Sequence, residues 1–169
     1  MKHNLFVLTT ALIRPKIHSE GIANFIKLVN SSNNLQKKFK NIYFLINLDN
    51  IGKIDSKENR KLLKKFSNNI NLNIYENTKE PCFFKAFKNV YIKCNEIQNN
   101  KENNIFFWLE DDWNITNDNF INHLEKEIIS FRNDDNQYLM TVNWKPSGPP
   151  FLFKQFYFDK VIYYLNNFH

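Results

Sequence analysis

Three consecutive carboxylates, Glu110, Asp111 and Asp112, directly follow an apolar run from Ile105 to Leu109. Adjacent acids repel one another unless a cation, a basic group or water compensates them, and hard divalent cations prefer carboxylate oxygens as ligands. Five large apolar residues in a row are typical of an inner strand of a sheet that is covered on both faces. Ligands of open α/β sheets bind at the carboxyl ends of strands. The segment therefore predicts a metal–phosphate site. The competing interpretation is a solvated turn, or a cap of the next helix.

Polar residues also end the first two apolar runs of the chain, namely Thr9, Thr10 and Arg14 after the first run and Asp49 after the second. The carboxyl ends of parallel strands meet at one edge of a sheet, so we expect these groups to converge with the acidic triplet. Hydroxyls and an arginine can hold a nucleotide beside a metal, and Asp49 can accept hydrogen bonds from a base or ribose. For Arg14 a surface loop, and for Asp49 a turn, fit the sequence equally well.

The elements that must position these groups alternate between strand and helix patterns. Strands are predicted at 5–10, 42–48, 72–75, 105–109, 138–142 and 151–153. Apolar residues at helical spacing predict helices that begin near 19, 55, 80, 117 and 159. Such alternation predicts an α/β fold with a mostly parallel sheet, flanked by helices and joined by right-handed crossovers. We expect the chain, 1–169, to form a single domain.

Composition narrows the functional classes. The chain is 43% hydrophobic and has 17 Phe, which is ample for a core, and its formal net charge is +6. The lysines are spread along the chain and no aromatic-basic motif accompanies them, so no nucleic-acid partner is expected. A basic surface would suit an anionic nucleotide donor, or peripheral contact with an anionic membrane.

The cysteines and the N-terminus favour a cytoplasmic protein. Cys82 and Cys94 lie on one predicted helix, about 18 Å apart, which is too far for a disulfide and fits a reducing compartment. The apolar run near the N-terminus is too short and too early for a signal peptide, and no apolar segment reaches membrane-spanning length. The sequence has neither a G-x-G-x-x-G nor a P-loop motif, so neither a dinucleotide fold nor a P-loop kinase is indicated.

Three segments together resemble the nucleotide-sugar-dependent glycosyltransferases of the GT-A fold, particularly the family 2-like group. They are Phe6–Thr10, Ile46–Asp49 and above all Phe107–Asp112, which looks like a strand that ends in a D-x-D-type motif. The resemblance covers roughly residues 5–142 and implies a Rossmann-like sheet of the GT-A type. Such triplets are short and common, so the motif is moderately specific.

The resemblance also implies roles for individual residues. Asp112 would contact the metal, Mn²⁺ or Mg²⁺, while Glu110 and Asp111 would support the ribose and the metal shell. The helix before that strand often carries small and polar residues that face the sugar donor. The matching positions here are Lys85, Ala86 and Asn89.

The sequence departs from the family pattern after the acidic triplet. Family members usually continue well past the motif with acceptor-side strands, a catalytic base and often a metal-binding His, whereas little more than fifty residues follow here. Asp159 is the leading candidate for the base, with Asp134 and Asp135 as alternatives. His169 is either a metal ligand or part of a frayed terminus. The chain could be a minimal, truncated or inactive relative.

These expectations combine into one leading hypothesis and two alternatives. The leading one is a metal-dependent glycosyltransferase that moves a sugar from a nucleotide-diphosphate sugar to a hydroxyl of a glycan, lipid or protein acceptor. Asp159 would deprotonate that hydroxyl if the enzyme inverts configuration. One alternative is a noncatalytic binding module on the same scaffold. The other is a nucleotidyltransferase, although the Gly-rich loop usual in such enzymes is absent between Thr9 and Ser19.

Overall fold

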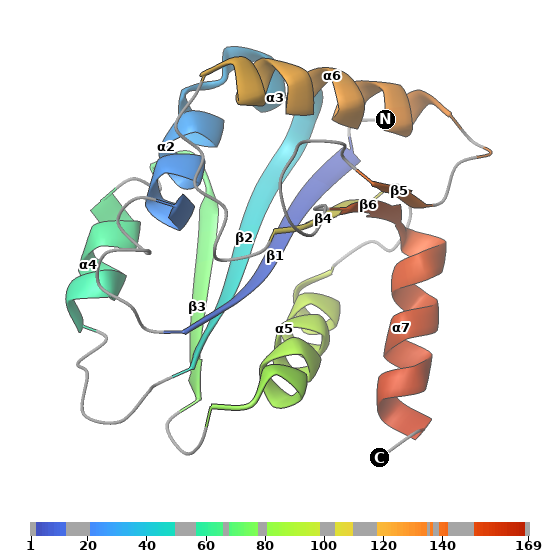
Figure 1. Ribbon diagram of the computed structural model, residues 1–169. Helices are drawn as coiled ribbons and strands as arrows, with labels where there is room; N and C mark the ends of the chain where they lie inside the picture. The colour runs from blue at the N-terminus through green and yellow to red at the C-terminus, as the bar shows by residue number, and fades with distance from the viewer. Residues whose placement is uncertain are drawn as a thin grey trace.

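A six-stranded sheet forms the centre of the computed structural model (Figure 1). The structure describes residues 3–12, 21–49, 57–65, 68–77, 81–98, 104–109, 118–134, 136, 139–141 and 151–167. The strands are β1 (His3–Leu12), β2 (Phe39–Asp49), β3 (Asn71–Asn77), β4 (Asn104–Trp108), β5 (Leu139–Thr141) and β6 (Phe151–Lys154). Their order across the sheet is β3-β2-β1-β4-β6-β5.

The four strands β3, β2, β1 and β4 run parallel to one another. β1 lies between β2 and β4, and its residues from Leu5 to Leu8 are all at most 1% exposed. Burial on both faces explains why these strands read as continuous apolar runs rather than as alternating ones. The predicted α/β fold with a mostly parallel, Rossmann-like sheet is therefore confirmed.

The sheet is not parallel throughout, because β6 runs antiparallel to both of its neighbours, β4 and β5. The segment 142–150 that joins β5 to β6 is shorter than the dozen or so residues that a parallel crossover needs. β5 and β6 therefore pair as antiparallel neighbours. The insertion of β6 between β4 and β5 returns the chain to the amino end of β4, where the last helix begins.

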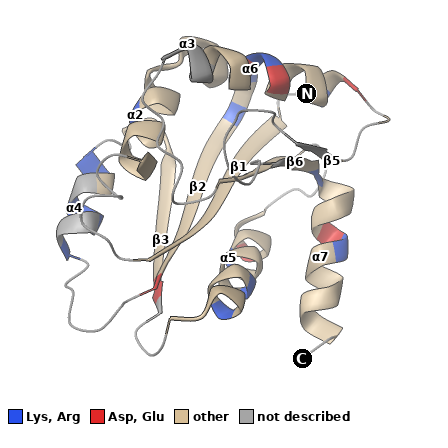
Figure 2. Ribbon diagram, viewed as in Figure 1, with Lys and Arg blue, Asp and Glu red and all other residues tan. Residues whose placement is uncertain are grey.

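Helices cover both faces of the sheet. They are α2 (Ala23–Ser31), α3 (Asn33–Lys38), α4 (Lys57–Lys65), α5 (Phe83–Ile97), α6 (Asp118–Asn133) and α7 (Gln155–Asn167). Figure 1 shows α5 and α7 side by side on one face, with the other helices on the opposite face. Charged residues gather mainly on the helices in Figure 2. The arrangement is a three-layer α/β/α sandwich.

Two cores follow from the alternation of side chains along the strands. Leu5 and Val7 pack toward α2, α3, α4 and α6, while Phe6 and Leu8 pack toward α5 and α7. The second core is largely aromatic. The ring of Phe106 stacks on Phe153 and Phe158 at centroid distances of 5.2 and 4.4 Å.

Some local predictions differ from the structure. Helix α3 was not predicted as a separate element, and α7 begins at Gln155 rather than at Asp159. Phe83 has the helical spacing of the buried face of α5, with Phe87 and Val90, but at the first position of the helix it is 63% exposed. Among the helices of the described ranges, none combines the length and hydropathy that a bilayer crossing requires.

The aromatic core gives a first testable prediction. Phe106→Ala should lower the free energy of unfolding by about 3–5 kcal/mol, because it leaves a cavity among stacked rings. Urea denaturation followed by circular dichroism measures this change. The matched control is Phe156→Ala on the outer face of α7, where the ring is 55% exposed and the expected loss is below about 1 kcal/mol. Equal losses in the two variants would contradict the description of this core.

Candidate functional site

The carboxyl ends of β1 and β2 form one wall of a cavity of about 330 Å³. The parallel register places Thr10 opposite Asn47 and Leu12 opposite Asp49, so the polar ends of both strands lie at the same edge. The beginning of α5 closes the other side. The lining residues are Thr10, Ala11, Leu12, Asp49, Pro81, Cys82, Phe83 and Ala86. The structure thus brings together Thr10, Asp49 and Ala86, three of the residues that the sequence singles out.

Asp49 links β2 to α5. Asp49 is only 3% exposed, and both of its carboxylate oxygens accept hydrogen bonds from the protein. Oδ1 accepts from Asn47 Nδ2 at 3.0 Å, and Oδ2 accepts from the backbone N–H of Cys82 at 2.8 Å. Cys82 is the N-cap residue of α5 and makes no side-chain cap of its own. The carboxylate therefore supplies the missing acceptor at a helix start, where the helix dipole also favours negative charge.

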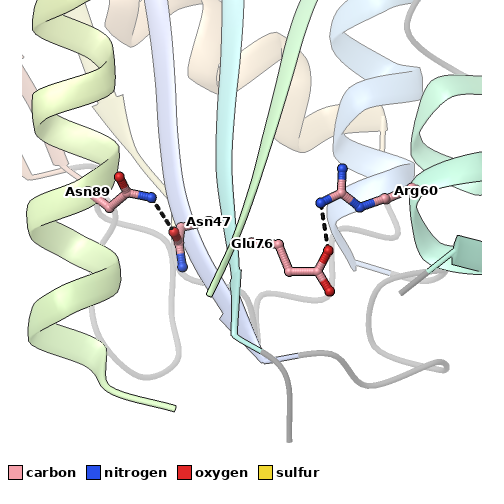
Figure 3. A network of polar contacts seen from close by, with 4 residues as sticks. All are labelled: Asn47, Arg60, Glu76 and Asn89. Atoms are coloured by element: carbon pink, nitrogen blue, oxygen red, sulfur yellow. Dashed lines mark hydrogen bonds and ion pairs between the residues drawn. The ribbon is translucent and has the colours of Figure 1, made fainter. Parts of the chain in front are cut away.

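A second amide continues this chain of hydrogen bonds into α5. Asn89 donates from Nδ2 to Oδ1 of Asn47 at 2.7 Å (Figure 3). Asn47 is fully buried, so its amide needs partners at both ends. Sequence reasoning selected Asn89 and Asp49 but assigned nothing to Asn47. The available signal was its spacing: two polar residues two positions apart in an apolar strand share one face.

The Asp49 carboxylate keeps capacity for a ligand. Two carboxylate oxygens offer about four acceptor positions, and the protein donors described above use two of them. An ionised carboxylate only accepts, so the cavity wall at this point can bind a group that presents an N–H or O–H. Phe83, at the edge of the same cavity, offers an exposed aromatic ring.

Thr9 faces away from the cavity. It is fully buried, it is not among the lining residues, and it shares a strand face with Val7 of the core on the α2 and α6 side. Its hydroxyl donates to the backbone oxygen of Thr10 at 3.3 Å. The structure therefore separates the two threonines, with Thr10 at the cavity and Thr9 on the opposite face of the sheet.

The other residues that were expected near the nucleotide-sugar donor do not line the cavity or lie outside the described residues. Lys85 is exposed on the first turn of α5, outside the cavity lining. Arg14 lies outside the described residues. So does the acidic triplet, Glu110 to Asp112, although the structure describes the chain up to Leu109. The backbone N–H of Leu109 donates to the oxygen of Leu8 in β1 at 2.9 Å, so the chain still follows β1 beyond the last residue of β4.

Within the described ranges, no three His, Cys, Asp or Glu side chains cluster closely enough to hold a metal ion. The acid at the end of β3, Glu76, is engaged by Arg60 of α4, with Nη2 to Oε2 at 2.7 Å (Figure 3). Asp49 is held by protein donors as described above. A metal at this edge would therefore depend on acids outside the described ranges, to which the predicted triplet belongs.

Asp159, the predicted base, lies far from the cavity. Its Oδ1 accepts from Gln155 Nε2 at 2.9 Å, and Gln155 Oε1 accepts from Asn104 Nδ2 at 2.9 Å. Asn104 is the first residue of β4, about 13 Å of strand before Trp108 at the carboxyl end. The structure thus places Asp159 near the amino edge of the sheet and does not bring it to Asp49. Asp134, a further candidate, is exposed at the end of α6 and accepts from its neighbour Asn136.

The two cysteines have different surroundings. Cys82 is half-buried and lines the cavity, whereas Cys94 is fully buried in the aromatic core. Burial raises the pKa of the Cys94 thiol well above its ordinary value. Both are free thiols, as the predicted distance along α5 requires.

Comparison with known proteins supports the fold. No known protein family and no curated protein matches the sequence. Among solved structures, residues 1–349 of S. aureus TarS match with a TM-score of 0.57 and 11% identity over 95% of this chain. Rv0371C of Mycobacterium tuberculosis H37Rv, in complex with manganese, matches with 0.53 and 10% over 96%. A 4-diphosphocytidyl-2C-methyl-D-erythritol synthase matches with 0.56 and 11% over 100%.

These matches differ in how much of each neighbour the chain spans. It spans about half of the TarS fragment, 49%, but 76% of Rv0371C and 81% of the synthase. TarS 1–349 has also been solved in complex with UDP, and that structure matches with a TM-score of 0.56. At such low identities the likeness shows the fold, a GT-A-like α/β fold that other proteins use with a nucleotide or with manganese.

The contrast between the thiols predicts their reactivity. At pH 8 a chromogenic disulfide reagent should modify Cys82 in the folded protein and spare Cys94, because only Cys82 reaches a cavity and the raised pKa of Cys94 keeps it protonated. Both should react in denaturant. The stoichiometry of released chromophore measures this. Rapid modification that persists in Cys82→Ser would contradict the placement of Cys94.

Proposed function

We propose that the chain is a glycosyltransferase that uses a nucleotide-diphosphate sugar as donor. The observation that carries this proposal is the cavity at the carboxyl ends of β1 and β2, with the fixed Asp49 carboxylate in its wall. This edge is where ligands bind in open α/β sheets. The cavity volume is that of a small-molecule site. The fold that the chain shares with TarS, solved with UDP, and with Rv0371C, solved with manganese, supports the same assignment.

The nucleoside would occupy the cavity. Asp49 would accept hydrogen bonds from an N–H of the base or a hydroxyl of the ribose, and the exposed ring of Phe83 would cover one side of the ligand. Thr10 lines the cavity from β1, the strand that lies between β2 and β4. Arg14, four residues further along the chain, would pair with the diphosphate.

Asp112, supported by Glu110 and Asp111, would hold Mn²⁺ or Mg²⁺. Their carboxylate oxygens are the ligands that such cations prefer, and they follow Leu109, whose backbone pairs with β1. When bound, the metal would neutralise the negative charge that develops on the departing nucleoside diphosphate. Lys85 of α5 would add positive charge on the donor side.

The acceptor is a hydroxyl of a glycan, lipid or protein. In an inverting enzyme a base must remove its proton, and Asp159 stays a prediction from sequence for that role. The distance of its hydrogen-bonding partners from the cavity argues for a base from elsewhere in the protein.

A nucleotidyltransferase is the second candidate, favoured by the coverage of the diphosphocytidyl-methylerythritol synthase, of which the chain spans 81%. The two activities release different products. A glycosyltransferase releases a nucleoside diphosphate from a nucleotide sugar, whereas a nucleotidyltransferase releases pyrophosphate from a nucleoside triphosphate. Noncatalytic binding, the third candidate, releases neither product.

Nucleotide binding should protect Cys82. With Mn²⁺ and saturating UDP, alkylation of Cys82 by a maleimide should slow by about tenfold or more, because the ligand would fill the cavity that the thiol lines. Calorimetry on the same sample measures the affinity for UDP.

Asp112→Asn should abolish the dependence of UDP binding on Mn²⁺. Cys82 protection by UDP with no effect of Asp112→Asn would remove the metal from the proposal, and absence of UDP binding would remove the donor site.

Replacement of Asp49 should affect binding more than folding. Asp49→Asn keeps the shape but lacks the charge and one acceptor oxygen, so UDP affinity should fall by about tenfold to hundredfold. Loss of the cap on α5 should cost about 1 kcal/mol of stability. Calorimetry and urea denaturation separate the two effects. The control is Glu76→Gln at the end of β3, outside the cavity lining, which should leave UDP affinity within about twofold.

A further inference from the structure

Two amides, the half-buried Asn89 and the fully buried Asn47, connect α5 to the cavity carboxylate in series. Asn89 donates to Asn47 at 2.7 Å, and Asn47 donates to Asp49 at 3.0 Å (Figure 3). Neither asparagine belongs to the cavity lining. A fully buried Asn47 in a strand that is otherwise apolar would cost stability unless both ends of its amide were satisfied.

The order of the hydrogen bonds fixes the orientation of Asn47. A carboxylate only accepts, so the Nδ2 end of Asn47 must face Asp49. Its Oδ1 end then faces Asn89, which donates to it. A flipped Asn47 would set its oxygen against the carboxylate and its nitrogen against the donor of Asn89. Both contacts of a flipped amide would be unfavourable, so Asp49 sets the orientation of Asn47 and the donor of Asn89 stabilises it from the other end.

The locked amide in turn holds the carboxylate from one side, while the backbone of Cys82 holds it from the other at 2.8 Å. One donor thus comes from the same strand and one from the start of α5. With one position on each oxygen occupied, the remaining acceptor positions point in fixed directions. Such support from neighbouring groups is what keeps a binding group within the narrow range of useful geometries.

We propose that Asn89 and Asn47 are positioning residues, which orient Asp49 so that the cavity selects nucleotides presenting an N–H or O–H donor at that point. This inference rests on the proposed nucleotide site and deepens it. It assigns to Asn89 an indirect role through Asn47, rather than direct contact with the sugar donor.

The test compares UDP with two analogues that each lack one donor, namely 2′-deoxy-UDP and N3-methyl-UDP. Calorimetry should show that the wild-type protein prefers UDP over at least one analogue by about tenfold or more. In Asn89→Ala, and in Asn89→Asp, which removes the donor but keeps the size, this preference should shrink to within about threefold. The matched control is Asn95→Ala, on the same helix, where Oδ1 has no partner among the described residues. It should keep the wild-type preference.

The ratio of affinities isolates positioning from folding. A variant that merely unfolds in part loses affinity for UDP and for the analogues equally, so its ratio stays unchanged. A wild-type ratio retained in both Asn89 variants would overturn the inference. So would a wild-type protein that binds UDP and both analogues equally well.

A second measurement needs no ligand. Hydrogen exchange followed by nuclear magnetic resonance should show the Cys82 amide protected in the wild type by its bond to Asp49. In Asn89→Ala its protection should fall about tenfold, while that of Ala86, bonded to the oxygen of Cys82 within α5, should change less. Unchanged protection of Cys82 would overturn the positioning role. Failure of the wild type to bind UDP would instead overturn the proposed function, and exchange would still decide whether Asn89 orients Asp49.

Discussion

The parallel strands are buried on both faces, and the placement of polar groups at the strand ends follows from that burial. β1 and β4 lie between two layers of helices, and the side chains along their buried middle, 5–8 and 105–108, are all apolar. Polar chemistry is then confined to the strand ends. The carboxyl edge receives Thr10 and Asp49, while the amino edge receives a chain of amides that includes Asn4 and Asn104. The cavity exists because the strands stop there and α5 begins.

Asp49 shows how the same contacts serve fold and site. Its carboxylate caps α5 through the Cys82 amide and is itself held by Asn47. A buried carboxylate costs free energy unless donors surround it, and the helix start and the amide supply them. These bonds leave acceptor capacity at the cavity wall. Loss of this side chain would therefore disturb both the geometry of α5 and whatever the cavity binds.

Much of the fold could be predicted from the sequence because its signals are local. Continuous apolar runs marked β1, β2 and β4, and helical spacing marked α5 and α6. The position of β6 could not be read in this way, since a four-residue apolar run says nothing about direction or neighbours. The site divides along the same line. The spacing of Thr10 and Asp49 at strand ends was visible, but the partner of each side chain was not.

By itself, the sequence determined which residues are buried in strands and which polar residues end them, because periodicity and apolar runs act over short distances. Which of the two threonines lines the cavity became clear only in the fold: Thr10 does and Thr9 does not, since a shift of one residue along a strand reverses the face. The tertiary structure also decided that Asp159 belongs to the amino edge, because the antiparallel β6 returns the chain there before α7 begins. Asn47 and Asn89 meet across forty-two residues, a contact that only packing can make.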